Sequence, residues 1–349
     1  MAASVPGLYA SSALGVAQGY NLFDLGAFTV TSGTSDIQGS VAVGGALAFS
    51  SGAGYSSINQ SSLSASPATP GLIVEGNASF SGGQLDNGNA GLGYFGGNVS
   101  GTYTFQHGYD YVGTTSVGGT GTHIAASSMP ITAAQFASAA TSLEQLSSTL
   151  GGESTAGTVN SGGATVVNNS GNYTLTATSC SNSLCVFDLP SASTYNSITI
   201  TAPSGAAVVI NVPGSSANGS AAFSNGQITY NGSACTGGSS CGASNVLMNF
   251  TSTNSAGTLS ASGYGLVNVL APYLTFTGGG GHIDGELIIG AINESSGASE
   301  LEGADIFSNS NLPSGGSSTP EPATWVLMGT AMLAFAGFRS KRAATVAVK

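Results

Sequence analysis

Residues 206–212 read Ala-Ala-Val-Val-Ile-Asn-Val, and this stretch decides the class of fold. It does not alternate apolar and polar side chains, as a strand with one face in water would. Its Val and Ile residues are β-branched and favour strands. The stretch is therefore predicted to be a β-strand that is buried on both faces, as strands in parallel sheets are.

Similar short apolar segments recur through the body of the chain between turns rich in Gly, Asn and Ser. Most neighbouring segments have no helical pattern between them. A doubly wound sheet, which connects parallel strands through helices, is therefore not expected. We therefore expect a mainly β fold in the form of an irregular right-handed parallel β-solenoid. Its coils should be irregular because no strict sequence repeat is visible. The predicted strands are 40–47, 71–74, 102–105, 165–167, 173–176, 197–201, 206–212, 246–250, 266–270 and 286–289.

One segment has the periodicity of a helix, with apolar residues three and four positions apart. Pro130 suits the first turn, with Ser127 or Ser128 near the cap, and Gly151 is expected to stop the helix. We expect one lateral α-helix over residues 131–149 that packs against the strands.

Charge is distributed along the chain in an unusual way. Only 5% of residues are charged, against about 25% in ordinary soluble proteins. All four Lys and Arg follow residue 338, and residues 1–338 carry all 15 Asp and Glu. A nucleic-acid partner is therefore not expected, because such binding uses Lys and Arg to neutralise phosphates. A lysine-dependent phosphate loop and a lyase that uses Lys or Arg as base are disfavoured for the same reason.

The four cysteines form two local pairs, Cys180 with Cys185 and Cys235 with Cys241. Two small disulfide loops in an exported protein are the preferred interpretation. Free thiols and a zinc site stay open as alternatives, although the usual short zinc knuckles are missing.

The C-terminal segment contains three elements in order. A Gly/Ser linker, 313–319, leads to Pro320-Glu321-Pro322, an apolar run over 323–338, and the basic residues Arg339, Lys341 and Arg342. As a hydrophobic helix the run would span about 24 Å, a little less than the roughly 30 Å of a bilayer core. The basic residues would keep that end in the cytoplasm.

This segment, 320–342, resembles the PEP-CTERM sorting signal of Gram-negative bacteria. The resemblance implies a membrane stage through the C-terminal helix and processing by an exosortase. The short tail 343–349 departs from the pattern, since such signals usually end at the basic residues. Residues 1–19 are small and apolar without a positive start, and we interpret them as the remnant of a truncated signal peptide.

The strongest candidate ligands for a metal are His282, Asp284 and Glu286, which alternate along a predicted strand and would share one face. Weak Ca²⁺ binding is predicted in this region, where Glu294, Glu300, Glu302 and Asp305 form a looser acidic patch nearby. The competing interpretation is a glycine-flanked turn with a structural Asp. No other cofactor is expected. Asp284 and Glu286 are also the best carboxylate pair for a glycan hydrolase, the enzymatic alternative.

Five segments of the body resemble the bacterial choice-of-anchor A family. They span most of residues 20–312 in the expected order, and the family often carries a sorting tail. The resemblance implies an ice-binding-like adhesive β-solenoid with one helix alongside and no catalytic residues. The segments are the opening of the domain, 21–23 followed by 35–45, and then 208–212, 247–250, 270–272 and 283–289.

These observations predict an exported adhesive or matrix protein that is not an enzyme. It would be sorted through the inner membrane to the outer surface of a Gram-negative bacterium or its extracellular matrix. There it would bind polysaccharide or another surface without turnover. The alternatives are the hydrolase, a structural coat protein, and an ice binder. The ice binder would use the T-x-T pairs Thr199/Thr201 and Thr275/Thr277.

Overall fold

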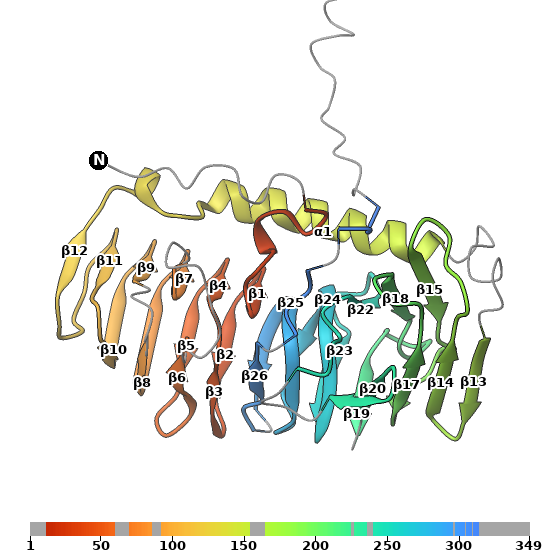
Figure 1. The fold of residues 1–349 in the computed structure, drawn as a ribbon. Helices are drawn as coiled ribbons and strands as arrows, with labels where there is room; N and C mark the ends of the chain where they lie inside the picture. The colour runs from red at the N-terminus through yellow and green to blue at the C-terminus, as the bar shows by residue number, and fades with distance from the viewer. Residues whose placement is uncertain are drawn as a thin grey trace, which may run out of the picture. The chain divides into compact units, whose positions relative to one another are not determined.

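The computed structural model describes residues 12–59, 70–85, 92–153, 165–224, 227–235, 240–295, 297–303, 305–308 and 310–313. The chain divides into two units, Met1–Gly315 and Gly316–Lys349, and every described residue belongs to the first. That unit is mainly β, with one α-helix among its described residues (Figure 1). The predicted sorting signal at 320–342, its hydrophobic helix at 323–338 and the tail at 343–349 lie outside the described residues.

A continuous row of parallel strands, which we call the helix-side row, runs beneath helix α1 (Ala133–Glu153) (Figure 1). Many of its strands are buried at every position, as predicted for Ala207–Val212. In spatial order the row contains β15 (Leu184–Asp188), β18 (Ala207–Val212), β22 (Val246–Phe250), β24 (Tyr264–Phe276), β25 (His282–Glu294), β1 (Leu22–Asp24), β4 (Val41–Val43), β7 (Leu72–Val74), β9 (Gly93–Phe95), β11 (Tyr109–Tyr111) and β12 (Gly121–His123).

Two further rows of parallel strands share strands with the first: the second row shares β24 and β25, and the third shares β25. The second row contains β16 (Thr194–Tyr195), β19 (Ala221–Ser224), β23 (Thr258–Ser262), β24, β25, β2 (Phe28–Val30), β5 (Leu47–Phe49), β8 (Ala78–Leu85) and β10 (Val99–Phe105). The third row runs from β25 through β26 (Glu300–Glu302), β3 (Thr34–Ile37) and β6 (Gly54–Ile58) to β8.

The pairings of the second and third rows close on each other. From β25 they pass through β2, β5, β8, β6, β3 and β26 and return to β25. Seven parallel strands thus form a closed barrel, with the other strands of this sheet outside it. The expected irregular right-handed parallel β-solenoid, an open architecture, is therefore wrong. The barrel closes because two strands, β25 (13 residues) and β8 (8 residues), are long enough to pair with different neighbours at their two ends. Each of them therefore joins the second row to the third.

A smaller sheet contains β13 (Thr165–Asn169), β14 (Asn172–Thr176), β17 (Ile198–Thr201), β20 (Ile228–Tyr230) and β21 (Ser233–Cys235). Its three central strands, β14, β17 and β20, are parallel, and β13 and β21 flank them antiparallel. Two short 3-10 helices complete the fold, η1 (Gly15–Ala17) and η2 (Ala126–Ser128).

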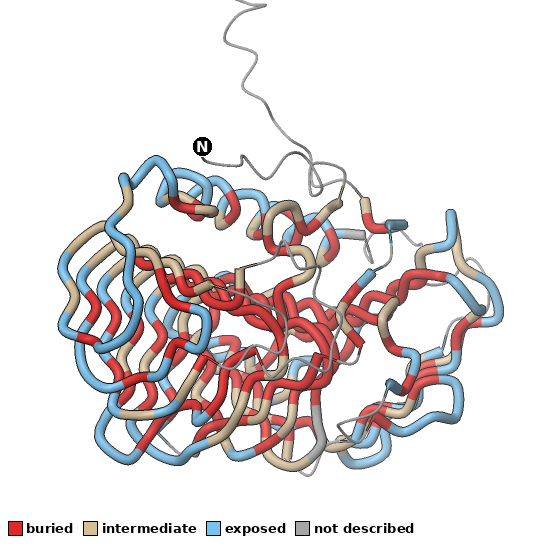
Figure 2. Tube along the Cα trace, turned by 60° about the vertical axis from the view of Figure 1, so that its left-hand side comes forward, coloured by how far each residue is buried: buried red, intermediate tan, exposed pale blue. Residues whose placement is uncertain are grey.

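Aromatic rings fill the space between the rows. Phe28, Phe49 and Phe80 stand on successive strands β2, β5 and β8, with centroids 5.7 and 5.8 Å apart and edge-to-face geometry. Tyr103 on β10 stacks on Phe80 at 4.2 Å. Because side chains alternate along a strand, these inward rings leave the residues beside them facing outward. Figure 2 shows the result, a buried interior with exposed turns.

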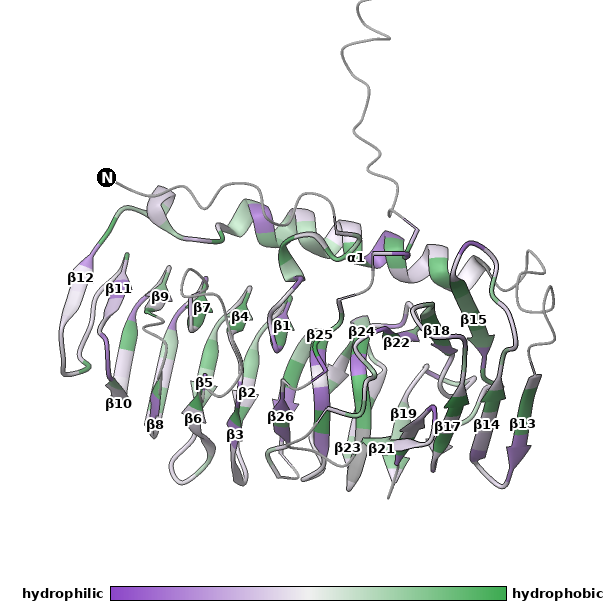
Figure 3. Ribbon diagram, viewed as in Figure 1, coloured by the Kyte–Doolittle hydropathy of each residue, from purple (hydrophilic) through white to green (hydrophobic). Residues whose placement is uncertain are grey.

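Helix α1 covers the outer side of the helix-side row. Its buried residues Phe136, Leu143 and Leu146 pack on apolar side chains such as Val209 and Ile288. Figure 3 shows hydrophobic colour on α1 and on strands of the row beneath it. This second apolar face explains why these strands lack the alternating pattern.

The ends of the helix differ from the sequence prediction. Thr132 caps it, since the Thr132 Oγ1 accepts the Gln135 amide while Gln135 Oε1 accepts the Thr132 amide at 2.9 Å. This is a capping box. Ser127 and Ser128 instead lie in η2. The helix also continues through Gly151 to Glu153, because its last turns are anchored by the sheet.

The anchor is a pair of buried asparagines on neighbouring strands. Asn211 Nδ2 donates to the Leu150 carbonyl at 2.9 Å, and Asn249 Nδ2 donates to the Ser147 carbonyl at 3.0 Å and to Asn211 Oδ1 at 2.8 Å. The Leu150 carbonyl lies in the last turn, where carbonyls have no intrahelical donor, so the Asn211 amide supplies its partner in the core. The Asn249 amide attaches the helix to the sheet one turn earlier, at Ser147.

We predict that Leu146→Ala lowers the free energy of unfolding by about 2–5 kcal/mol, because it leaves a cavity between helix and sheet. Urea unfolding of the purified chain measures the change. The exposed neighbour provides the control, since Gln145→Ala should stay within about 0.5 kcal/mol. Equal effects of both substitutions would contradict the packing described here.

Candidate functional site

The second row exposes a line of small side chains, which we call the small-polar row. None of them carries a charge, and each lies beside an inward apolar residue such as Phe28 or Leu47. Neighbouring strands set them about 4.8 Å apart. In spatial order the row is Thr194, Ala222, Ser260, Thr277, Asn293, Thr29, Ala48, Ser79 and Ser100. Thr277 directly follows the last residue of β24, and its amide continues the ladder by donating to the Leu259 carbonyl.

Such a surface has a defined chemistry. Hydroxyl and amide groups donate and accept hydrogen bonds, and short side chains leave the face flat. A flat, regular, uncharged face suits an extended hydroxyl-bearing partner better than a compact charged ligand. Sequence reasoning identified only Thr277 of this row; the rest became visible once the strand register aligned residues far apart in the chain.

The smaller sheet carries a second regular array, made of threonines. Thr174, Thr199 and Thr229 lie in register on β14, β17 and β20, and Thr176 pairs with Thr201 one step along. The predicted pair Thr199/Thr201 belongs to this array, and both residues are exposed. The other predicted pair, Thr275/Thr277, lies in the second row instead.

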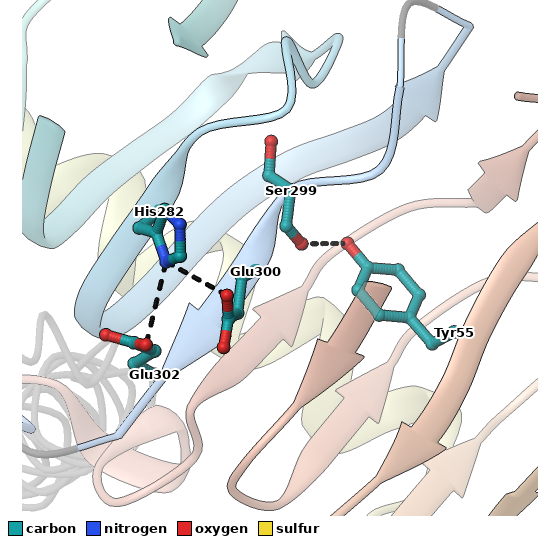
Figure 4. A network of polar contacts seen from close by, with 5 residues as sticks. All are labelled: Tyr55, His282, Ser299, Glu300 and Glu302. Carbon is teal, nitrogen blue, oxygen red and sulfur yellow. Dashed lines mark hydrogen bonds and ion pairs between the residues drawn. The ribbon is translucent and has the colours of Figure 1, made fainter. Parts of the chain in front are cut away.

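A third feature is an acidic cluster where β25, β26 and β3 meet; we call it the carboxylate cluster. His282 lies between two glutamates, with its Nδ1 at 3.0 Å from Glu300 Oε2 and 3.6 Å from Glu302 Oε1 (Figure 4). The full cluster is Asp36, His282, Asp284, Glu300, Glu302 and Asp305.

Burial and neighbouring negative charges raise the pKa values of three acids in this cluster, Asp284, Glu300 and Asp36. Burial raises the pKa of Asp284 to about 7, the charges of Asp305 and Glu302 add to the rise, and the Asp305 amide offsets part of it. The pKa values of Glu300 and Asp36 are raised by burial as well, and His282 partly offsets both.

The three residues predicted as metal ligands do not form one group. His282 joins Glu300 and Glu302, and Asp284 lies beside Glu302 in the register. Glu286 belongs to neither group, because β25 bends at Gly285, whose φ is +126°. Residues 282–284 pair with β26, whereas residues 287–289 pair with β1. Whether these residues bind a metal stays a prediction.

Other acids are buried singly. Asp24 is fully buried, and burial raises its pKa to about 7 against the effect of one hydrogen bond from the Gly26 amide. Burial also raises the pKa of Glu294 to about 7, although the Tyr55 hydroxyl donates to it at 2.9 Å. The same hydroxyl lies 3.0 Å from the Ser299 carbonyl (Figure 4). Burial raises the pKa of Glu286 well above its usual range.

The structure joins the cysteines as two local pairs. Cys180 is bonded to Cys185 and Cys235 to Cys241, with Cα atoms 4.9 and 5.0 Å apart. The first loop ends inside β15, at Cys185, and the second links β21 to the segment before β22.

The comparisons with known proteins identify two segments. Residues 13–302 match the family model of an ice-binding-like adhesive domain. Residues 318–342 match the PEP-CTERM protein-sorting motif. Searches of curated proteins and of solved structures find no match. In the described part of the chain, no helix is long and apolar enough to span a membrane.

The fold, the uncharged face and the sorting motif define an exported, surface-sorted protein of a Gram-negative bacterium. Because the match covers most of its length, the chain belongs to the ice-binding-like adhesive domain family. The sorting motif also implies processing by exosortase-type machinery, as predicted.

We predict that stability falls as pH rises from about 4 to about 7. Between these values the unfolded state has released the Asp24 proton while the folded state still holds it, so rising pH favours unfolding. Asp24→Asn should remove this contribution, matching wild type near pH 4. Above pH 7 it should be more stable by up to about 4 kcal/mol.

Urea unfolding at pH 4, 6 and 8 measures the effect. Glu75→Gln, on a partly exposed acid, is the control for loss of one carboxylate. An Asp24→Asn profile parallel to wild type would show that Asp24 titrates normally in the fold.

Proposed function

We propose that this protein is an adhesin that binds uncharged polysaccharide through the small-polar row, without turnover. The observation that carries the proposal is the row itself, nine aligned positions without a charge or a large side chain. Polysaccharide chains are long and rich in hydroxyls, so many weak contacts along such a row can add up.

The negative charge of the protein favours an uncharged partner over an anionic one. Residues 1–338 contain 15 acids and no Lys or Arg. The resulting negative field repels anionic polymers at long range. Neutral glycans do not meet that barrier.

The arrangement of the acids disfavours the hydrolase alternative. A glycosidase needs two carboxyl groups that flank the scissile bond. Asp284 is 3% exposed and Glu286 is 1% exposed, and the chain bends between them at Gly285. A polymer substrate has no access to either group.

The proposed route to the surface follows from the sorting motif. The apolar run at 323–338 would hold the chain in the inner membrane while an exosortase acts at Pro320-Glu321-Pro322. The basic residues Arg339, Lys341 and Arg342 would remain on the cytoplasmic side. After processing, the adhesive domain would reside on the outer surface or in the extracellular matrix.

We expect Ala48→Lys to weaken binding to a neutral insoluble glucan by about tenfold or more, because a long side chain holds the polymer off the flat face. Co-sedimentation of the purified chain measures binding, and released reducing ends are assayed in the same tubes. No release is expected.

The matched control is Ser56→Lys, which adds the same charge at an exposed position on β6 in the third row. It should change binding less than about twofold. If both variants bind like wild type, the small-polar row is not the adhesive face. If sugar is released, the protein is an enzyme.

The threonine array favours a second candidate, ice binding. Threonines in register on β14, β17 and β20 present methyl and hydroxyl groups at the strand spacing on a flat, exposed face. A regular array of this kind can order water in a fixed lattice.

We expect Thr199→Tyr to abolish thermal hysteresis if the array binds ice, because the ring breaks the flat face at its centre. Nanolitre osmometry measures hysteresis, and Ala48→Lys should leave it unchanged. Absence of hysteresis in wild type would remove this candidate and leave the adhesin proposal intact.

A further inference from the structure

The carboxylate cluster has too little positive charge for its number of acids. It gathers five carboxyl groups, and Asp284, Glu302 and Asp305 are each less than 5% exposed. No Lys or Arg exists anywhere in residues 1–338 to compensate them. His282 is the one side chain in the cluster able to carry a positive charge. Buried carboxylates without a cation are costly, so the cluster requires protons or a bound ion.

The geometry around His282 is that of a ligand set. Single ligand atoms of His282, Glu300 and Glu302 all lie within 4.8 Å of one another. The Nδ1–Oε separations are 3.0 and 3.6 Å. Ligands at about 2.0–2.2 Å from a central ion, at angles near 90–110°, are separated by roughly this much.

The strands hold the three side chains in place. His282 pairs with Glu300 across the β25–β26 ladder, and Glu302 follows two residues later on the same face. Between them, Ile283 and Leu301 point into the core and are fully buried. The group is thus set on rigid backbone, as preorganised binding sites are.

A second observation concerns the acid next to Glu302 across the β25–β26 ladder. Asp284 pairs with Glu302 in the register and is 3% exposed. Neither of its carboxylate oxygens forms a hydrogen bond with any residue that the structure describes. Asp305 beside it accepts hydrogen bonds from the Cys241 amide at 2.7 Å and from the Ser240 hydroxyl at 2.6 Å. Among the described residues, Asp284 and Glu286 have both carboxylate oxygens buried and without a hydrogen bond, and of these two acids Asp284 lies in the cluster.

The geometry points to a divalent metal site formed by His282, Glu300 and Glu302, with Asp284 adjoining it as a further oxygen donor. One imidazole with several carboxylates suits Zn²⁺ and similar transition ions. Ca²⁺ prefers an all-oxygen set, so it fits these residues less well. Cys241 also lies near Asp284, but its sulfur is bonded to Cys235.

We expect the purified full chain, stripped with EDTA and dialysed, to bind one Zn²⁺ in isothermal titration calorimetry. Ca²⁺ in a parallel titration should bind at least about tenfold more weakly. His282→Gln should weaken Zn²⁺ binding by about tenfold or more, and Glu300→Gln should have the same direction of effect. Glu300 is partly exposed, so the second variant tests the site even if the first does not fold.

The matched controls are His107→Gln and His123→Gln, which remove exposed histidines far along the chain from the cluster. Both should bind Zn²⁺ within about twofold of wild type. The inference is overturned if wild type binds no Zn²⁺, if Ca²⁺ binds more tightly, or if a control variant loses binding as His282→Gln does. None of these results bears on adhesion through the small-polar row.

Discussion

Strand β25 pairs with β24, β26, β1 and β2, and the arrangement of the other strands depends on this one ladder. Its three segments serve three rows in turn, so a single strand fixes how the rows meet. The bend at Gly285 separates the segments that pair with different rows. Glycine is needed at this position because a Cβ atom would collide with the Asn268 side-chain amide. Closure of the barrel, placement of the small-polar row and assembly of the carboxylate cluster all follow from it.

Scarcity of basic residues shapes the rest of the molecule. With no Lys or Arg before residue 339, polar groups in the core are satisfied by neutral partners. Asn211 and Asn249 bind helix carbonyls, and Tyr55 binds Glu294. Burial still raises the pKa of Glu294, and it also raises the pKa of acids such as Asp24 and Glu286. The uncharged small-polar row and the carboxylate cluster are two results of the same composition.

Sequence reasoning could predict the features that depend on residues close together in the chain. The unbroken apolar run at 206–212 indicated a strand buried on both faces, and the structure shows the reason, an interior of aromatic rings on one side and α1 on the other. The helix was visible from its period, but its cap at Thr132 and its extension past Gly151 depend on side-chain and sheet contacts. The open solenoid was wrong because no local pattern reveals that β8 and β25 each serve two rows.

By itself the sequence determined the strand class, the helix beside the sheet and the sorting tail, and it favoured the two local cysteine pairs, since each depends on composition or on spacing within a few residues. Only the tertiary structure decided which residues share a surface. Thr29, Ala48, Ser79 and Ser100 are about 20 to 30 residues apart in the chain yet adjacent across strands. His282 meets Glu300 and Glu302 while Glu286, only four residues away, does not. Register and bends bring distant residues together and separate near ones, and both are set by long-range backbone pairing.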